Sequence, residues 1–153
     1  MSGNYLLSLA VPLVSMCLAA TFYVLSRQQP QHAHLKDWAL VYVLGVAGFT
    51  IELMRVYGFG DFVSLSSNVF HGLATVFTAR GVFARYGDRR YERALWLLYG
   101  AGMAGAVFFS YAVPDVIARS ASMSIAISLM LGLAAWCVFS AHAKDLIDRL
   151  LAG

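Results

Sequence analysis

Residues 120–142 read SASMSIAISLMLGLAAWCVFSAH and contain no Lys, Arg, Asp or Glu. An α-helix crosses the hydrocarbon core of a bilayer, which is ~30 Å thick, with about 20 predominantly apolar residues. This stretch is long enough for one complete crossing. It therefore predicts a transmembrane helix and sets the class of fold.

Four further stretches of the chain pass the same test of length and apolar content. They are residues 5–26, 37–57, 62–85 and 94–113. The composition agrees, because 60% of the residues are hydrophobic and 12% are charged, against about 25% charged residues in soluble domains. The predicted fold is an all-α integral membrane protein, a bundle of five transmembrane helices formed by residues 1–143.

The placement of Lys and Arg predicts the orientation of the bundle, because short cytoplasmic loops carry an excess of both. With the N-terminus outside and the C-terminus in the cytoplasm, only Arg55 and Arg119 lie on the outer side, and the other nine of the 11 basic residues lie inside. Aromatic residues independently mark the two membrane interfaces. They are Tyr5, Tyr57 and Tyr111 at the outer ends, and Trp38, Tyr86, Tyr91 and Trp96 at the inner ends.

The last ten residues, 144–153, are compatible with an amphipathic helix, with Leu and Ile on one face and charged residues on the other. Three interpretations are open. The segment is a helix lying in the membrane interface, a cytoplasmic connector, or the start of a further spanning helix. In the last two cases the chain would continue beyond Gly153.

Glycines are concentrated in two of the predicted helices. Gly100, Gly102 and Gly105 lie in the stretch 94–113, and Gly45 and Gly48 lie in the stretch 37–57. Small residues let helix backbones approach closely in lipid, where no hydrophobic force drives helices together. We interpret them as packing positions, either between helices of one chain or at a seam between two copies.

Polar residues of the second and third predicted helices fall at a similar depth in the outer half of the membrane. Glu52 and Arg55 share one face at a spacing of three residues, and so do Asn68 and His71. The connection between the two helices is short, so the four side chains are expected to converge. Ionisable residues inside a membrane are functional candidates by default.

This predicted polar site has two interpretations. In the first, a Glu–Arg pair lies at the rim, and Asn68 or His71 holds two helices together. In the second, the four residues form a pocket that senses a ligand or a proton, for which the reference pKa of histidine, ~6.5, is suited. Ser122 and Ser124, near the outer end of the fifth helix, could join this site.

Patterns that would indicate catalysis, metal binding or nucleic-acid binding are missing from the sequence. Cys17 and Cys137 lie in apolar stretches and are interpreted as packing or lipid-facing residues. His71 is the only histidine deep in a predicted helix, so no two histidines could sandwich a haem iron, and no HExxH motif or Cys/His cluster suggests zinc. No nucleophile–base pair or phosphate-binding loop occurs. We expect no enzymatic activity, no cofactor and no nucleic-acid partner.

Two runs, IELMRVYGFGDFVSLSSNVFHGL (51–73) and TARGVFARYGDRR (78–90), resemble the membrane-embedded N-terminal sensor regions of bacterial GGDEF-type diguanylate cyclases. The resemblance covers about residues 50–90. The matching positions are Arg55, Ser67, Asn68, Gly81, Tyr86, Gly87 and Arg89. His71 is not part of the pattern, and no GGDEF-like sequence occurs in the chain. The resemblance implies an input module of cyclic di-GMP signalling in a bacterial inner membrane, with its output domain outside this chain.

We therefore expect a multi-pass sensory module without catalytic activity of its own. It would sense a small molecule or a membrane state and would couple this signal to a cytoplasmic output domain. Its partners would be the lipid bilayer and either a second copy or a larger membrane complex. The alternative is an accessory structural subunit of a larger membrane complex, which has no ligand of its own.

Overall fold

The computed structural model describes residues 3–54, 60–86 and 89–151, which form five α-helices and no strand. Side chains are described from Ala10 to His142, apart from those of residues 55–62, 64, 87 and 88. The helices are α1 (Gly3–Gln28), α2 (His34–Met54), α3 (Gly60–Tyr86), α4 (Glu92–Tyr111) and α5 (Val116–Leu151).

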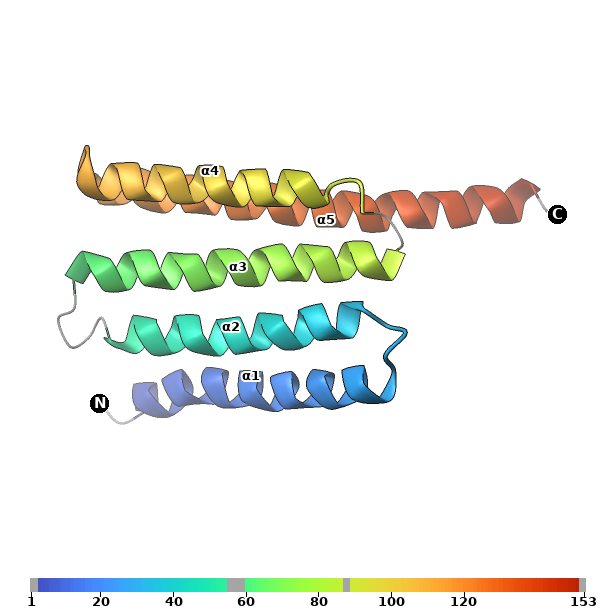
Figure 1. Cartoon of the computed structure of the whole chain (residues 1–153), viewed down its shortest axis with the longest axis horizontal. Helices are drawn as coiled ribbons and strands as arrows, with labels where there is room; N and C mark the ends of the chain where they lie inside the picture. Colours follow the sequence, from blue (N-terminus) through green and yellow to red (C-terminus); the bar gives the residue numbers. More distant parts are fainter. Residues whose placement is uncertain (1–2, 55–59, 87–88, 152–153) are drawn as a thin grey trace.

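The five helices run alternately up and down and lie side by side (Figure 1). Helices α1, α2 and α3 follow one another in space as they do in sequence, and α4 and α5 pack together on the other side of α3. Within the described residues, α1 packs only against α2, whereas α3 packs against α2, α4 and α5. Helix α3 is therefore the central element and α1 is peripheral.

In the part of the chain that the structure describes, four helical segments are long and apolar enough to cross a membrane: Ala10–Gln28, His34–Met54, Glu92–Tyr111 and Val116–His142. Helix α3, which contains the predicted span 62–85, is not among them. Large apolar side chains cover their outer faces, with Leu97 74% exposed, Ile117 82% and Phe139 69%. A water-soluble protein would bury such residues, whereas lipid accommodates them. The chain is thus an all-helical protein with the helices of a multi-pass membrane protein.

Helix α3 is less apolar than the other four because protein surrounds it. Val76, Ala79 and Phe83 of α3 are almost fully buried and pack with Leu95 of α4 and Met130 of α5 in the main core cluster. Its hydroxyl groups find acceptors within the helix, as the Thr75 and Thr78 hydroxyls donate to carbonyl oxygens four residues earlier, at 3.0 and 2.8 Å. A helix in this central position needs less lipid-compatible surface than a peripheral one.

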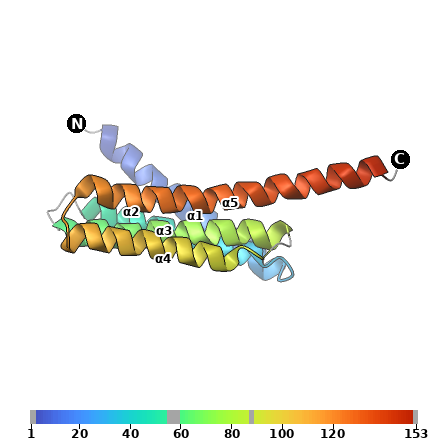
Figure 2. The ribbon, with the colours of Figure 1, turned by 90° about the horizontal axis from the view of Figure 1, so that it is seen from above.

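Helix α5 is longer at both ends than the predicted stretch 120–142. It begins at Val116 because the Asp115 carboxylate accepts hydrogen bonds from the backbone N–H groups of Ile117 and Ala118, at 2.8 and 3.0 Å, and so caps the helix. It then continues without a break to Leu151, a total of 36 residues, or about 54 Å at 1.5 Å per residue. Its C-terminal part extends well past the other helices (Figure 2).

Candidate functional site

His71 lies in the interface between α2 and α3. Its imidazole covers Gly48, where an added Cβ would stand 3.0 Å from the ring carbon Cε1. The ring also meets Phe49 edge to face, with ring centroids 5.5 Å apart. His71 therefore packs closely onto α2 at Gly48, where an added methyl group would require the ring to shift by a few tenths of an ångström.

The other residues of the predicted outer site lie on more than one surface of the bundle. Glu52 lies one turn beyond Gly48 on α2, and both Glu52 and Asn68 are half-buried. Arg55 lies outside the described residues. Ser122 packs against Gly105 of α4, where a Cβ would come within 2.9 Å of the serine Cβ, and Ser124 is exposed. The two serines thus belong to other surfaces than the α2–α3 interface that holds His71.

The glycines of α4 divide into two groups. Gly102 and Gly105 face α5, since a Cβ on Gly102 would stand 2.6 Å from the Cβ of Ala126 and a Cβ on Gly105 would meet Ser122. Gly100 is exposed, and no described atom lies within 4 Å of the position its Cβ would take. The same holds for the space around Gly45 on α2. Gly48, Gly102 and Gly105 therefore serve contacts within the chain, while Gly45 and Gly100 face open space.

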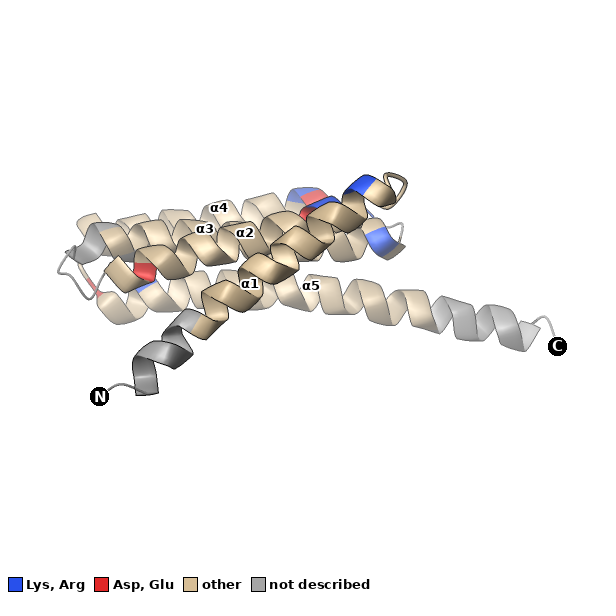
Figure 3. Cartoon of the chain, turned by 90° about the horizontal axis from the view of Figure 1, so that it is seen from below, with Lys and Arg blue, Asp and Glu red and all other residues tan. Residues whose placement is uncertain are grey.

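A cluster of charged side chains lies at the end of the bundle where α1 and α3 finish and α2 and α4 begin, here called the basic end (Figure 3). Arg80 of α3 is its centre. The Arg80 Nε atom lies 2.8 Å from Glu92 Oε1 of α4, and its Nη2 atom lies 4.0 Å from Asp37 Oδ1 of α2. One guanidinium group thus joins three helices, and we call this arrangement the Arg80 clasp.

The two carboxylates of the Arg80 clasp lie at helix N-termini, where a negative charge is favourable. Asp37 lies in the first turn of α2, and Glu92 is the first residue of α4. Carboxylates are stabilised near helix N-termini, where unpaired N–H groups give a partial positive charge. The side chains of Arg80, Asp37 and Glu92 are 29%, 16% and 33% exposed. The ion pairs are therefore partly buried, and salt screens them less than it would screen fully exposed pairs. The Arg80 guanidinium also lies 5.1 Å from the centre of the Phe77 ring.

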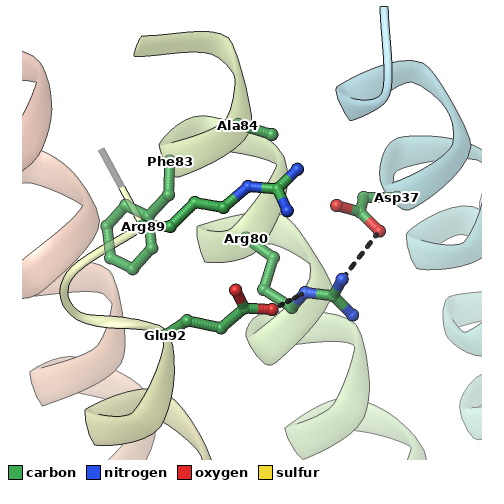
Figure 4. A pocket seen from close by; sticks show the side chains of 6 residues that line it. All are labelled: Asp37, Arg80, Phe83, Ala84, Arg89 and Glu92. Carbon is green, nitrogen blue, oxygen red and sulfur yellow. Dashed lines mark ion pairs between the residues drawn. The ribbon is translucent and has the colours of Figure 1, made fainter. Parts of the chain in front are cut away.

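Arg89, which precedes α4 in the chain, completes the cluster, and its side chain reaches toward Asp37 (Figure 4). The pocket enclosed by this cluster has a volume of about 10 Å³ and is lined by Asp37, Arg80, Phe83, Ala84, Arg89 and Glu92. A single water needs roughly 10–15 Å³. The cluster is therefore a tight polar contact between helices, and in this conformation it has no room for a small-molecule ligand. Among the described residues, no group of three or more His, Cys, Asp or Glu side chains could hold a metal ion.

Trp38 joins the neighbouring part of the basic end. Its indole occupies the place where a Cβ on Gly81 of α3 would stand. Phe22 of α1 meets the same indole edge to face at 5.5 Å, and the Arg85 guanidinium lies 5.8 Å from its centre. A residue predicted only as an interfacial aromatic thus connects α1, α2 and α3.

The Arg80 clasp was not among the residues predicted to form a site. A signal for it exists in the sequence, because one basic and two acidic residues fall at the same end of three successive predicted helices. Depth alone does not give the direction in which each side chain points around its helix. The direction of each side chain becomes clear only from the structure, in which α3 packs between α2 and α4.

Three comparisons with known proteins, by family, by curated sequence and by solved structure, give no match to this chain. The function is therefore argued from the geometry of the chain itself.

Proposed function

We propose that this chain is a membrane signal-input module that senses a small molecule or a membrane state and passes the change to a cytoplasmic output domain. The observation that carries the proposal is the single α5 helix. Its 36 residues span about 54 Å, whereas the hydrocarbon core of a bilayer is ~30 Å thick. One rigid element therefore reaches from the packed core of the bundle into water, where an output domain could respond to its movement.

In this proposal all five helices cross the membrane, with the N-terminus outside and the C-terminus in the cytoplasm of a bacterial inner membrane. Helix α3 has 27 residues, or about 40 Å, and lies between α2 and α4, which are apolar enough to span. Seven basic residues gather at the basic end and support its cytoplasmic placement. They are Arg27, Lys36, Arg80, Arg85, Arg89, Arg90 and Arg93.

The Arg80 clasp supplies a candidate for the two-state element that a sensor needs. Arg80 pairs closely with Glu92 and stands farther from Asp37, so a small shift of α3 would exchange the two partners. Each pairing would hold the α4–α5 pair differently against α2. A signal would have to favour one pairing by a few kcal/mol to change the populations usefully.

The resemblance of residues 50–90 to the sensor regions of diguanylate cyclases supports the same assignment and suggests cyclic di-GMP synthesis as the output. The module itself would bind no cofactor and catalyse no reaction. The proposed partner of the module is a second copy of the chain, for which the exposed small residues of α4 offer a contact surface.

An accessory structural subunit is the second candidate function. It is favoured by the exposed small residues of α4, because Gly100, Ala101 and Ala104 offer a surface on which a helix of another membrane protein could pack closely. Such a subunit would have one conformation and would co-purify with large membrane partners.

Distance measurements by electron spin resonance in nanodiscs distinguish the two functions. Spin labels are attached to Gln31→Cys and Phe139→Cys, both exposed, after Cys17→Ser and Cys137→Ala. We expect two distance populations in the otherwise unchanged chain. Asp37→Asn leaves only the Glu92 pairing and Glu92→Gln leaves only the Asp37 pairing, so the two variants should select opposite populations.

Arg93→Gln is the matched control, because it removes an exposed charge of the basic end outside the clasp. It is expected to leave both populations unchanged. A single distance that none of the substitutions alters would contradict the input module and favour the accessory subunit.

A further inference from the structure

A groove runs between α1 and α2 on the outer surface of the bundle. At the basic end it forms a hollow of about 570 Å³, and it continues into a second hollow of about 310 Å³. The two hollows share Ala19 and Val43 as lining residues, so they form one continuous groove. Ligand sites in proteins commonly measure about 300–1,000 Å³.

The groove has the depth of one leaflet of a bilayer. It begins beside Arg27 and Lys36 and ends beside Met16 and Val46, a distance of about 15 Å along each helix. This is half of the ~30 Å hydrocarbon core. The space exists because α1 crosses the bundle obliquely (Figure 3) and alanines line the crossing.

The mouth of the groove is positively charged. Arg27 and Lys36 are both exposed and line it, and no carboxylate is found among the described residues that line this hollow. The Arg27 guanidinium lies 5.8 Å from the centre of the Tyr23 ring, which holds it at the rim. The Ser26 hydroxyl donates to the Tyr23 carbonyl oxygen at 2.7 Å, so it is used within the helix.

We infer that this groove binds one anionic phospholipid. The lipid phosphate would lie between Arg27 and Lys36, and an acyl chain would follow the alanine-lined floor to Met16 and Val46. Basic pockets between transmembrane helices are suited to anionic headgroups. A transmembrane helix of a second copy would need a groove through both leaflets, whereas this one spans a single leaflet. The inference does not depend on the signalling role proposed above.

Native mass spectrometry of the detergent-purified chain tests this site with phosphatidylglycerol and phosphatidylcholine as probes. The variant Arg27→Gln/Lys36→Gln is expected to bind phosphatidylglycerol about 30-fold more weakly and phosphatidylcholine as before. The control Arg90→Gln/Arg93→Gln removes the same charge elsewhere on the basic end and should bind phosphatidylglycerol normally. An excess of inorganic phosphate should not displace the lipid, because it lacks the acyl chain.

A second variant, Ala19→Phe, fills the part common to both hollows and keeps both cations. It should weaken the binding of both lipids. A phosphatidylglycerol with a photoreactive acyl chain should label the segments around residues 16–20 and 43–46 in the unchanged chain.

Three results would overturn the site. They are equal loss of phosphatidylglycerol binding in the Arg90/Arg93 control, labelling spread evenly over the chain, or an Ala19→Phe variant that binds lipid normally and loses a dimer instead. All three are read from lipid binding, so they are distinguishable from the spin-label distances that test the input module.

Discussion

At the scale of single residues, direction around a helix decides the role of each small or charged side chain. Gly100 and Gly102 are two positions apart, which places them about 200° apart around α4. Gly102 therefore faces Ala126 of α5, while Gly100 faces open space. The sequence indicates that both glycines lie in a spanning helix, but it does not indicate which way that helix is turned, so it cannot distinguish their roles.

The same substitution at these two glycines should therefore have opposite effects. Gly102→Ala places a Cβ 2.6 Å from that of Ala126, and such overpacking is expected to lower the free energy of unfolding by about 1–3 kcal/mol. Gly100→Ala meets no described atom and should raise it by about 0.5–1 kcal/mol, because glycine is unfavourable within a helix. Unfolding of each variant in mixed detergent micelles measures both changes. Equal destabilisation by Gly100→Ala would place Gly100 in a contact with another chain.

Arg80 shows the same limit for charged residues. Its identity and its place at one end of the chain are readable from the sequence, and so are those of Asp37 and Glu92. The pairing is not readable, because it depends on α3 standing between α2 and α4. The sequence places Glu52, Asn68 and His71 at a similar depth and on defined helix faces. It does not give how α2 and α3 are turned toward each other, and in the structure His71 packs against Gly48.

At the scale of elements, hydropathy predicts that helices exist but not where they end. The stretch 120–142 contains no Lys, Arg, Asp or Glu, while the helix that contains it starts at Val116 and reaches Leu151. Asp115 accounts for the early start, since a carboxylate before the first turn satisfies backbone N–H groups that would otherwise lack partners. Helix α5 ends at Leu151, beyond residue 142, because residues 143–151 are also compatible with a helix.

Removing the cap should loosen the start of α5 without disturbing the core. Asp115→Ala loses both hydrogen bonds to the N–H groups of Ile117 and Ala118, and we expect a loss of about 1 kcal/mol. Asp115→Asn keeps a capping oxygen and should lose far less. Hydrogen exchange of residues 117 and 118 measures the effect where it arises, and unchanged exchange in the alanine variant would show that the cap contributes nothing there.

At the scale of the whole molecule, the central position of α3 explains why its composition differs from that of a typical span. Among the described residues, four helices are long and apolar enough to cross a membrane, and α3, a predicted span over residues 62–85, is not one of them. Its neighbours α2, α4 and α5 cover much of its surface, so α3 tolerates more polar side chains than a peripheral helix would. The five-helix order could be read from the sequence, whereas the arrangement of α4 and α5 around α3 could not.

Labelling of single cysteines tests whether α3 crosses. Gln31 lies between α1 and α2, and Val113 lies between α4 and α5. With α2, α3 and α4 all spanning, the two positions are on opposite sides of the membrane. An impermeant maleimide added to intact cells should then label Val113→Cys and not Gln31→Cys, each in a background of Cys17→Ser and Cys137→Ala. Labelling of both or of neither would mean that α3 does not span, and labelling of Gln31→Cys alone would reverse the orientation.

The unbroken course of α5 has a mechanical consequence. A continuous helix resists twisting about its own axis far better than a chain with a flexible joint, so a rotation imposed by the neighbours of Met130 and Ala134 would arrive almost undiminished at Leu151. Successive residues of a helix are offset by about 100°. The rotational orientation of anything attached to the end of α5 is therefore set by the number of helical residues between it and the core of the bundle. The length of α5 thus fixes both a distance and an angle.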